Sequence, residues 1–207
     1  ALLGSKPRPV GWSERRQRLD EVGSTWPVAS DVKCEAVDCD GVAGEWSVVP
    51  GSEASRVLLY FHGGGYCSGS IVSHRRMVTE AGRAARMRTL AIDYRLAPEH
   101  PHPAALDDVW AVTQWATKTF DRVDLGGDSA SAQLAAVVAR RARDRQIQVE
   151  LQVLVVAVTD YSFDTLSHHE NGSGYALERE KMAWFWSLYV RDRASADDPD
   201  VSPLRAP

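Results

Sequence analysis

The sequence predicts an α/β fold built on a mostly parallel sheet. Compact apolar runs, typical of strands buried on both faces, occur at residues 56–61, 89–92 and 151–158. Three segments with helical periodicity lie between or beside them: one that Ser73 is expected to cap, and two over residues 106–113 and 130–143. Strands and helices that alternate along a chain indicate parallel pairing, because each helix carries the chain back across a face of the sheet.

Local patterns predict the remaining elements. Ser13 precedes a charged segment and is expected to cap a short helix through its hydroxyl. Residues 32–49 alternate apolar and polar side chains around Asp40-Gly41, which predicts a β-hairpin. A short strand is expected over residues 122–125. Residues 177–190 are expected to form an amphipathic helix, with four side chains on one face: Met182, Phe185, Trp186 and Tyr189.

The composition excludes several classes of function. The 207 residues are 44% hydrophobic and carry 24 Lys and Arg against 28 Asp and Glu, a net charge of −4. No window is densely basic, which argues against nucleic-acid binding, and no apolar run approaches the roughly 20 residues of a membrane span. The first four residues lack the apolar region of a secretory signal. Three cysteines are too few for a disulfide framework or a zinc site, so we expect free thiols and a cytoplasmic location. No metal or organic cofactor is expected.

A serine lies on a predicted strand-to-helix turn, in the sequence Gly127-Asp128-Ser129-Ala130-Ser131. Such a turn exposes the serine hydroxyl in front of the N-terminus of the following helix. The pattern departs from G-x-S-x-G at its last position, where Ser131 replaces glycine. Its Cβ and hydroxyl are expected to crowd the approach of helix to strand, so Ser131→Gly should keep or raise stability and turnover. Taken alone, the motif also fits an ordinary capped helix start.

Three consecutive glycines follow the strand predicted at residues 56–61, in the sequence His62-Gly63-Gly64-Gly65. Glycines let backbone N–H groups point into a site at φ values that other residues resist. Such donors stabilise the oxyanion of an acyl-transfer intermediate. A flexible loop and a phosphate cradle are the alternatives, but the next residues do not supply the Gly-Lys-Ser/Thr ending of a phosphate loop. With the serine turn downstream, the pattern favours an oxyanion hole.

Four motifs together resemble the hormone-sensitive-lipase family of α/β-hydrolases. In the order of that family they are Tyr60-Phe61-His62-Gly63-Gly64-Gly65-Tyr66, Asp93-Tyr94-Arg95-Leu96-Ala97-Pro98-Glu99-His100, Pro103-Ala104-Ala105 and Gly127-Asp128-Ser129-Ala130. The resemblance implies an α/β-hydrolase fold with helices on both faces of the sheet and a helical cap. It implies hydrolysis of short-chain carboxylic esters or lactones through a serine acyl-enzyme. It also implies a single domain over residues 1–207 that is incomplete at its C-terminus, without the last strands, and has cap elements at about 1–30 and about 162–195.

The resemblance also implies roles for individual residues. Ser129 is expected to be the nucleophile, and the oxyanion hole is expected to comprise Gly64, Gly65 and Ala130. His62 and Gly63 would shape the glycine loop, and Asp128 would be scaffold. The Asp and Arg of the segment 93–99 are expected to pair and brace that loop. Part of the acyl pocket would be lined by Met182, Phe185 and Trp186.

The sequence departs from the family in two places. In the family an Asp and a His follow the nucleophile after two further strands, but residues 202–207 resemble the segment just before the next strand. Both triad partners are therefore expected to lie outside this chain, and the 207 residues alone to be nearly inactive. Asp160 with His168 or His169 has the right chain order for an internal replacement, although the surrounding residues resemble a polar cap segment. The connection near residues 117–121 is short for the family, which leaves open that residues are missing there too.

Two other functions stay open beside the esterase. A non-catalytic small-molecule receptor on the same fold, as plant gibberellin receptors are within this family, would keep the pocket without the reaction. An inactive fragment would follow from a natural truncation. The intact Ser129 and glycine loop favour the enzyme. The expected partner is a small-molecule ester substrate, with no nucleic acid and no membrane span, and a homo-oligomer is left open.

Overall fold

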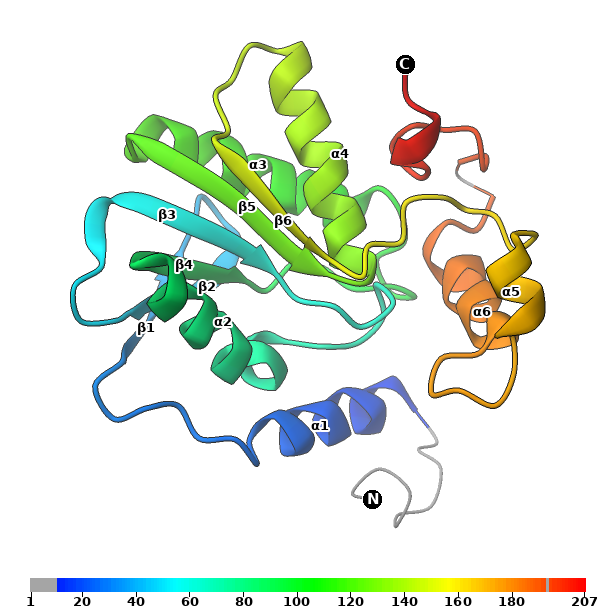
Figure 1. The fold of residues 1–207 in the computed structure, drawn as a ribbon, viewed down its shortest axis with the longest axis horizontal. Coiled ribbons are helices and arrows are strands. Elements are labelled where there is room, and N and C mark those ends of the chain that lie inside the picture. Colours follow the sequence, from blue (N-terminus) through cyan, green and yellow to red (C-terminus); the bar gives the residue numbers. More distant parts are fainter. Residues whose placement is uncertain (1–10, 193) are drawn as a thin grey trace.

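A computed structural model describes residues 11–192 and 194–207, and it has the predicted α/β fold (Figure 1). Six strands of this part of the chain form one sheet in the order β1-β2-β4-β3-β5-β6. Their bounds are β1 Lys33–Asp38, β2 Ala43–Val48, β3 Glu53–Phe61, β4 Met87–Ile92, β5 Arg122–Asp128 and β6 Leu151–Val155. The β1–β2 hairpin pairs antiparallel with β4, whereas β4, β3, β5 and β6 are mutually parallel. The predicted hairpin and the mostly parallel sheet are confirmed.

The helices lie on both faces of this sheet and beyond the ends of its strands. Their bounds are α1 Trp12–Gly23, α2 Ile71–Ala85, α3 Ala104–Thr119, α4 Ala130–Asp144, α5 Leu166–Glu170 and α6 Arg179–Tyr189. In Figure 1, α5 and α6 lie past the arrowheads of β5 and β6, on the side where the parallel strands end. Within the described residues no helix combines the length and the apolar character that crossing a bilayer requires.

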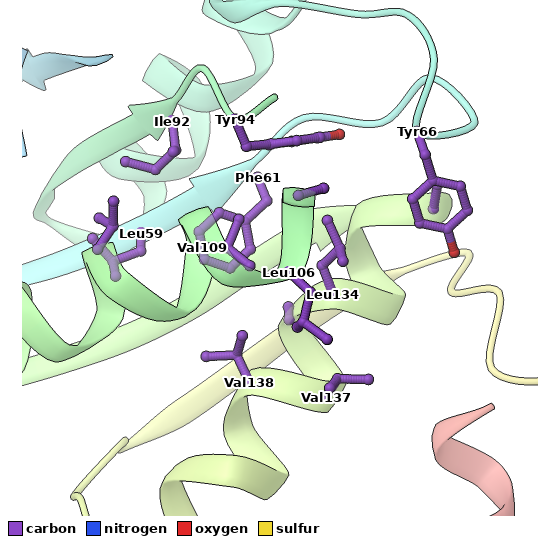
Figure 2. Close-up of a cluster of buried hydrophobic side chains, with 14 of the residues drawn as sticks. Leu59, Phe61, Tyr66, Ile92, Tyr94, Leu106, Val109, Leu134, Val137 and Val138 are labelled. Carbon is purple, nitrogen blue, oxygen red and sulfur yellow. The ribbon is translucent and has the colours of Figure 1, made fainter. Parts of the chain in front are cut away.

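Side chains of β3 alternate between two buried clusters, because successive residues of a strand point to opposite faces. Leu58 and Tyr60 pack in the smaller cluster with Val78 of α2. Leu59 and Phe61 belong to the larger cluster on the other face. Figure 2 shows this larger cluster, to which α3 and α4 contribute Leu106, Val109, Leu134, Val137 and Val138. The sheet is therefore the middle of three layers.

Two helices begin elsewhere than predicted. α1 has Gly11 at its N-cap position and no capping side chain, so the predicted capping by Ser13 is wrong. α2 begins earlier because the Ser70 hydroxyl accepts the N–H of Ser73 at 3.1 Å, while the Ser73 hydroxyl accepts the N–H of Ser70 at 2.8 Å. This reciprocal pair is a capping box. Ser73 is therefore the third residue of the helix and not its cap.

The apolar run at 151–158 forms a shorter strand than predicted, and its side chains are exposed. β6 ends at Val155, whose carbonyl accepts the N–H of Ser129 at 2.8 Å, and Val156 follows with a φ of 46°. Because β6 is the last strand of the sheet, one of its edges has no neighbour among the described residues. Its side chains are exposed, Val153 to 42%. Within the described residues β6 is therefore an open apolar edge of the sheet, as expected of a chain without the last strands.

The short connection near residues 117–121 is packed into the structure. α3 continues through Thr119, so only Phe120 and Asp121 precede β5. The Phe120 ring packs edge-on against the rings of Trp46 and Trp115. The N–H of Asp121 donates to the Ser55 carbonyl at 3.0 Å, which fixes the start of β5 beside β3.

We expect the exposed edge of β6 to make the 207-residue chain self-associate, because unpaired strand edges with apolar side chains invite pairing. Val153→Lys should reduce association and change the free energy of unfolding by no more than about 0.5 kcal/mol, since the side chain is exposed. Sedimentation velocity and urea unfolding measure the two effects. The matched control is Leu125→Lys on the neighbouring strand, which should unfold the chain because Leu125 is fully buried. Unchanged association in Val153→Lys would contradict the argument.

Candidate active site

Ser129 lies at a sharp turn between β5 and α4. β5 ends at Asp128 and α4 begins at Ala130, so one residue reverses the chain direction, and it does so with φ 55° and ψ −121°. A non-glycine residue in this region is strained and persists only where its surroundings hold it. Gly127 has no room for a side chain, since a Cβ there would lie 2.6 Å from the Ser131 carbonyl oxygen. The predicted strand–turn–helix is present, and Ser129 is half-buried at the N-terminus of α4.

The glycine loop after β3 presents free backbone donors beside this serine. Gly64 and Gly65 have φ values of 131° and 64°, and a Cβ on Gly64 would lie 2.0 Å from the Ser68 carbonyl oxygen. Both glycines line the same pocket as Ser129 and Ala130. No described residue accepts a hydrogen bond from the N–H of Gly64, Gly65 or Ala130. Three donors without an acceptor among the described residues therefore belong to the lining of the pocket that contains Ser129.

The Asp128 carboxylate joins the glycine loop to the serine turn. Its Oδ1 accepts the N–H of Gly63 at 2.9 Å and the hydroxyl of Tyr60 at 3.1 Å, and its Oδ2 lies 3.4 Å from His74 Nε2. Burial alone would raise the pKa of Asp128, but the hydrogen bond and charge of His74, with the donors from Gly63 and Tyr60, outweigh burial and hold that pKa below its usual value. Asp128 is thus an ionised anchor for the loop, in line with its expected scaffold role.

His62 supports the glycine loop from inside the protein. Its side chain is buried and stacks on Tyr94 with ring centroids 4.5 Å apart. Its Nδ1 lies 3.0 Å from the Gly63 carbonyl, and its Nε2 has no partner among the described residues. Burial lowers the pKa of His62 to about 4, so the imidazole is neutral near pH 7. His62 does not line the pocket that contains Ser129.

Ser131 makes contacts that its sequence position did not predict. Its side chain is fully buried, and its hydroxyl lies 2.8 Å from the Tyr94 hydroxyl and also bonds the His62 carbonyl. The Tyr94 hydroxyl reaches the same carbonyl at 2.6 Å. The expectation that Ser131 only crowds the turn is therefore wrong. Its hydroxyl ties α4 to the strand end that carries the glycine loop.

A pocket of about 390 Å³ opens in front of Ser129. Met182, Phe185 and Trp186 of α6 line it, as do Gly64, Gly65 and Ala130, so the structure brings these predicted site residues together. Phe185 packs directly on the glycine loop, because a Cβ on Gly65 would lie 2.6 Å from its ring. Tyr189, expected on the same face, lies deeper and stacks on Tyr66 with centroids 3.8 Å apart.

Sequence reasoning missed the wall that α1 contributes to this pocket. Trp12, Arg15, Arg18 and Leu19 line it, together with Lys181 of α6. The spacing of Trp12, Arg15 and Leu19 at i, i+3 and i+7 is a helical face that the sequence already contained. The first ten residues of the expected cap element 1–30 lie outside the described residues, as does residue 193 of the second element.

Two expected groupings differ in the structure. Arg95 pairs with Asp108 of α3, at 2.6 Å between Nη2 and Oδ1, so its expected pairing within segment 93–99 is wrong. The Arg95–Asp108 pair nevertheless braces segment 93–99, because it holds that segment against α3. The internal replacement triad is not assembled among the described residues. Asp160 is paired with Arg205 at 2.8 Å, and both histidines have local partners: His168 with Thr165 and His169 with Asp164.

Comparison with known proteins agrees with this geometry. The model of a family described as alpha/beta hydrolase fold matches residues 58–207. Carboxylic ester hydrolase LipN of Mycobacterium tuberculosis is 38% identical over 75% of this chain and 45% of its own length. A crystal structure of an esterase from the bacterial hormone-sensitive lipase family superposes with a TM-score of 0.87 at 30% identity, covering 98% of this chain and 69% of that one. Gibberellin receptor GID1 of Oryza sativa subsp. japonica is 28% identical over 75% of this chain and 47% of its own length. The chain spans about half the length of the curated relatives it matches.

We predict that Ser131→Ala lowers the free energy of unfolding by about 1–3 kcal/mol, because it removes a buried hydrogen-bonding group. Ser131→Gly should lower it further, since glycine inside a helix is less favourable than alanine by about 1 kcal/mol. Urea unfolding followed by circular dichroism measures both. The matched control is Ser187→Ala, which removes an exposed hydroxyl from α6 and should stay within about 0.5 kcal/mol of the unmodified chain. A Ser131→Gly chain that is more stable than the unmodified one would show that crowding outweighs the hydrogen bonds.

Proposed function

We propose that this chain, which belongs to the α/β-hydrolase fold family and is hormone-sensitive-lipase-like within it, carries the nucleophile and the oxyanion hole of a carboxylic ester hydrolase. The observation that carries the proposal is the position of Ser129. Its hydroxyl occupies a strained turn at the N-terminus of α4, beside three backbone N–H groups that have no acceptor among the described residues. Acyl transfer needs a nucleophile and hydrogen-bond donors for the oxyanion, and the lining of this pocket contains both.

Each of these groups has a defined part in the reaction. The Ser129 oxygen attacks the carbonyl carbon of an ester, and the electron pair of the C=O bond moves onto the carbonyl oxygen. The N–H groups of Gly64, Gly65 and Ala130 donate to that oxyanion, and the positive end of α4 adds to their effect. The alcohol then leaves, and water hydrolyses the acyl-enzyme. His62 and Gly63 shape the loop and take no part in proton transfer.

The serine proton needs a base, and the base needs an orienting acid. We propose that both come from a part of the complete protein outside these 207 residues. Three observations support this proposal. Asp160 is paired with Arg205, His168 and His169 bond to their own segment, and the chain spans about half the length of the curated relatives.

The pocket fits a small ester or lactone. Met182, Phe185 and Trp186 of α6 would contact the acyl group, since they line the same cavity as Ser129. In this proposal α1 and the α5–α6 segment act as the cap expected at about 1–30 and about 162–195. The cytoplasmic location expected from the free thiols, and self-association into a homo-oligomer, stay predictions.

A receptor without catalysis is the second candidate, and the similarity to GID1 favours it. A binding pocket alone would need neither the strained Ser129 nor free N–H groups beside it. An inactive fragment would likewise have no use for them. The two predictions that follow separate these functions.

Ser129 is expected to be the serine that an active-site-directed fluorophosphonate labels in the complete protein. Ser129→Ala should abolish labelling and reduce ester turnover by several orders of magnitude. Peptide mass spectrometry identifies the modified residue. Ser187→Ala is the matched control, because Ser187 is exposed on α6 and does not line the pocket. Labelling that persists in Ser129→Ala would exclude the assignment.

Gly65→Ala should lower kcat in the complete protein by about 10²–10³, the effect of losing one oxyanion donor. Its Cβ would lie 2.6 Å from the Phe185 ring, so either that ring or the glycine loop must shift. Gly51→Ala is the matched control: Gly51 has a similar φ of 79°, but a Cβ there meets no atom within 4 Å. Both changes place alanine at a similar positive φ, so the difference in kcat between the two variants measures the effect of the displaced glycine loop or Phe185 ring. Equal kcat values would contradict the proposed oxyanion hole.

A further inference from the structure

The pocket in front of Ser129 is positively charged although the chain is acidic. The chain has 28 Asp and Glu against 24 Lys and Arg. The pocket lining nevertheless contains three cationic side chains, Arg15, Arg18 and Lys181, and no carboxylate. All three lie on the cap side of the pocket, formed by α1 and α6, while the catalytic side is formed by backbone donors and apolar groups. The pocket therefore has a reactive end and a cationic end.

Arg15 is held in place without a carboxylate partner. Its guanidinium carbon lies 5.6 Å from the Trp12 ring centroid and 5.3 Å from the Trp184 ring centroid. These two rings stack on each other at 5.3 Å, which links α1 to α6. Among the described residues no Asp or Glu pairs with Arg15. Cation–π contacts fix a guanidinium but leave its N–H donors free for a ligand.

The neighbouring Arg16, in contrast, has its hydrogen bonds satisfied within the protein. The Arg16 guanidinium donates to both carboxylate oxygens of Glu99, at 3.0 and 2.7 Å, and to the carbonyls of Cys67 and Ala97. Arg18 pairs with Glu14 on its own helix. Arg15 and Lys181 differ from both, since no described carboxylate neutralises either of them.

Lys181 lines the same pocket from α6. It lies one turn before Trp184 and Phe185 on α6, and its side chain is exposed at the pocket mouth. Two cations that line one pocket without a carboxylate partner repel each other. An anion between them removes that repulsion and accepts charge-assisted hydrogen bonds from both. A neutral ligand gains neither effect.

We propose that the pocket selects esters whose acyl group ends in a carboxylate, which Arg15 and Lys181 bind while Ser129 faces the ester carbonyl. The methylene chain between the two ends packs on Met182 and Phe185. A half-ester of a short dicarboxylic acid has this chemistry. The inference rests on the proposed function, because it takes the reacting carbonyl to lie at Ser129.

Matched substrates test the selection in the complete protein. Mono-p-nitrophenyl glutarate carries the carboxylate, and its methyl ester is the neutral counterpart of nearly equal shape. The unmodified protein should have the higher kcat/KM for the anion, and rising salt, from about 0.05 M to about 0.5 M, should reduce that preference. Arg15→Gln and Lys181→Gln should each lower the ratio of the two kcat/KM values about tenfold, the effect of one charge-assisted hydrogen bond. Arg15→Lys should retain most of the ratio.

The control variant and a binding measurement complete the test. Arg179→Gln removes a cation from the same helix outside the pocket lining and should leave the ratio unchanged. Calorimetry with the unreactive p-nitroanilide of glutaric acid and its methyl ester measures the same preference without turnover, in the unmodified protein. If no ester is hydrolysed but the anionic anilide binds more tightly, the proposed function fails and the cationic site stands. Equal binding of the two anilides, or a ratio that Arg15→Gln and Lys181→Gln leave unchanged, overturns the inference.

Discussion

The site depends on the contact between the ends of two neighbouring strands. β3 and β5 pair in parallel with Phe61 opposite Gly127, so the segments that follow them emerge side by side. The Asp128 carboxylate closes this junction by accepting the N–H of Gly63, and a Cβ on Gly63 would lie 2.0 Å from its Oδ2. Only a glycine allows the approach. The register of one strand pair and the absence of one side chain thus place the glycine loop beside Ser129.

A buried cluster of hydrogen bonds also holds the two strand ends together. Tyr94, Ser131 and the His62 carbonyl form a buried hydrogen-bonded cluster, and the neutral His62 ring stacks on Tyr94. Buried polar groups are costly when unpaired, so a satisfied cluster resists rearrangement. The N–H groups of Gly64, Gly65 and Ala130 belong to residues next to this cluster in the chain, since Gly64 and Gly65 follow His62 and Ala130 precedes Ser131. Donors fixed in advance require no reorganisation when charge develops on a substrate.

How far the sequence predicts this structure depends on the range of the interactions involved. Hydrophobic periodicity and glycine spacing are local, and they predicted the hairpin, the parallel strands, the serine turn and the glycine loop. The partners of Ser131 are 37 and 69 residues away, and Arg95 reaches Asp108 on a helix whose packing the sequence does not show. The exposure of β6 likewise depends on which strands flank it. Local patterns predict which elements form, whereas side-chain partners require the packing of those elements.

The helices proposed to form the cap contact the glycine loop directly. One side of the pocket belongs to the ends of β3 and β5, while α1 and α6 build the other side and join through the stacked rings of Trp12 and Trp184. Phe185 of α6 packs against Gly65, where no side chain would fit. If α6 shifts when a ligand binds at the proposed cationic end, its Phe185 ring must move against the loop that carries the proposed oxyanion donors. In the proposed function, α6 is thus mechanically coupled to the geometry on which the reaction at Ser129 depends.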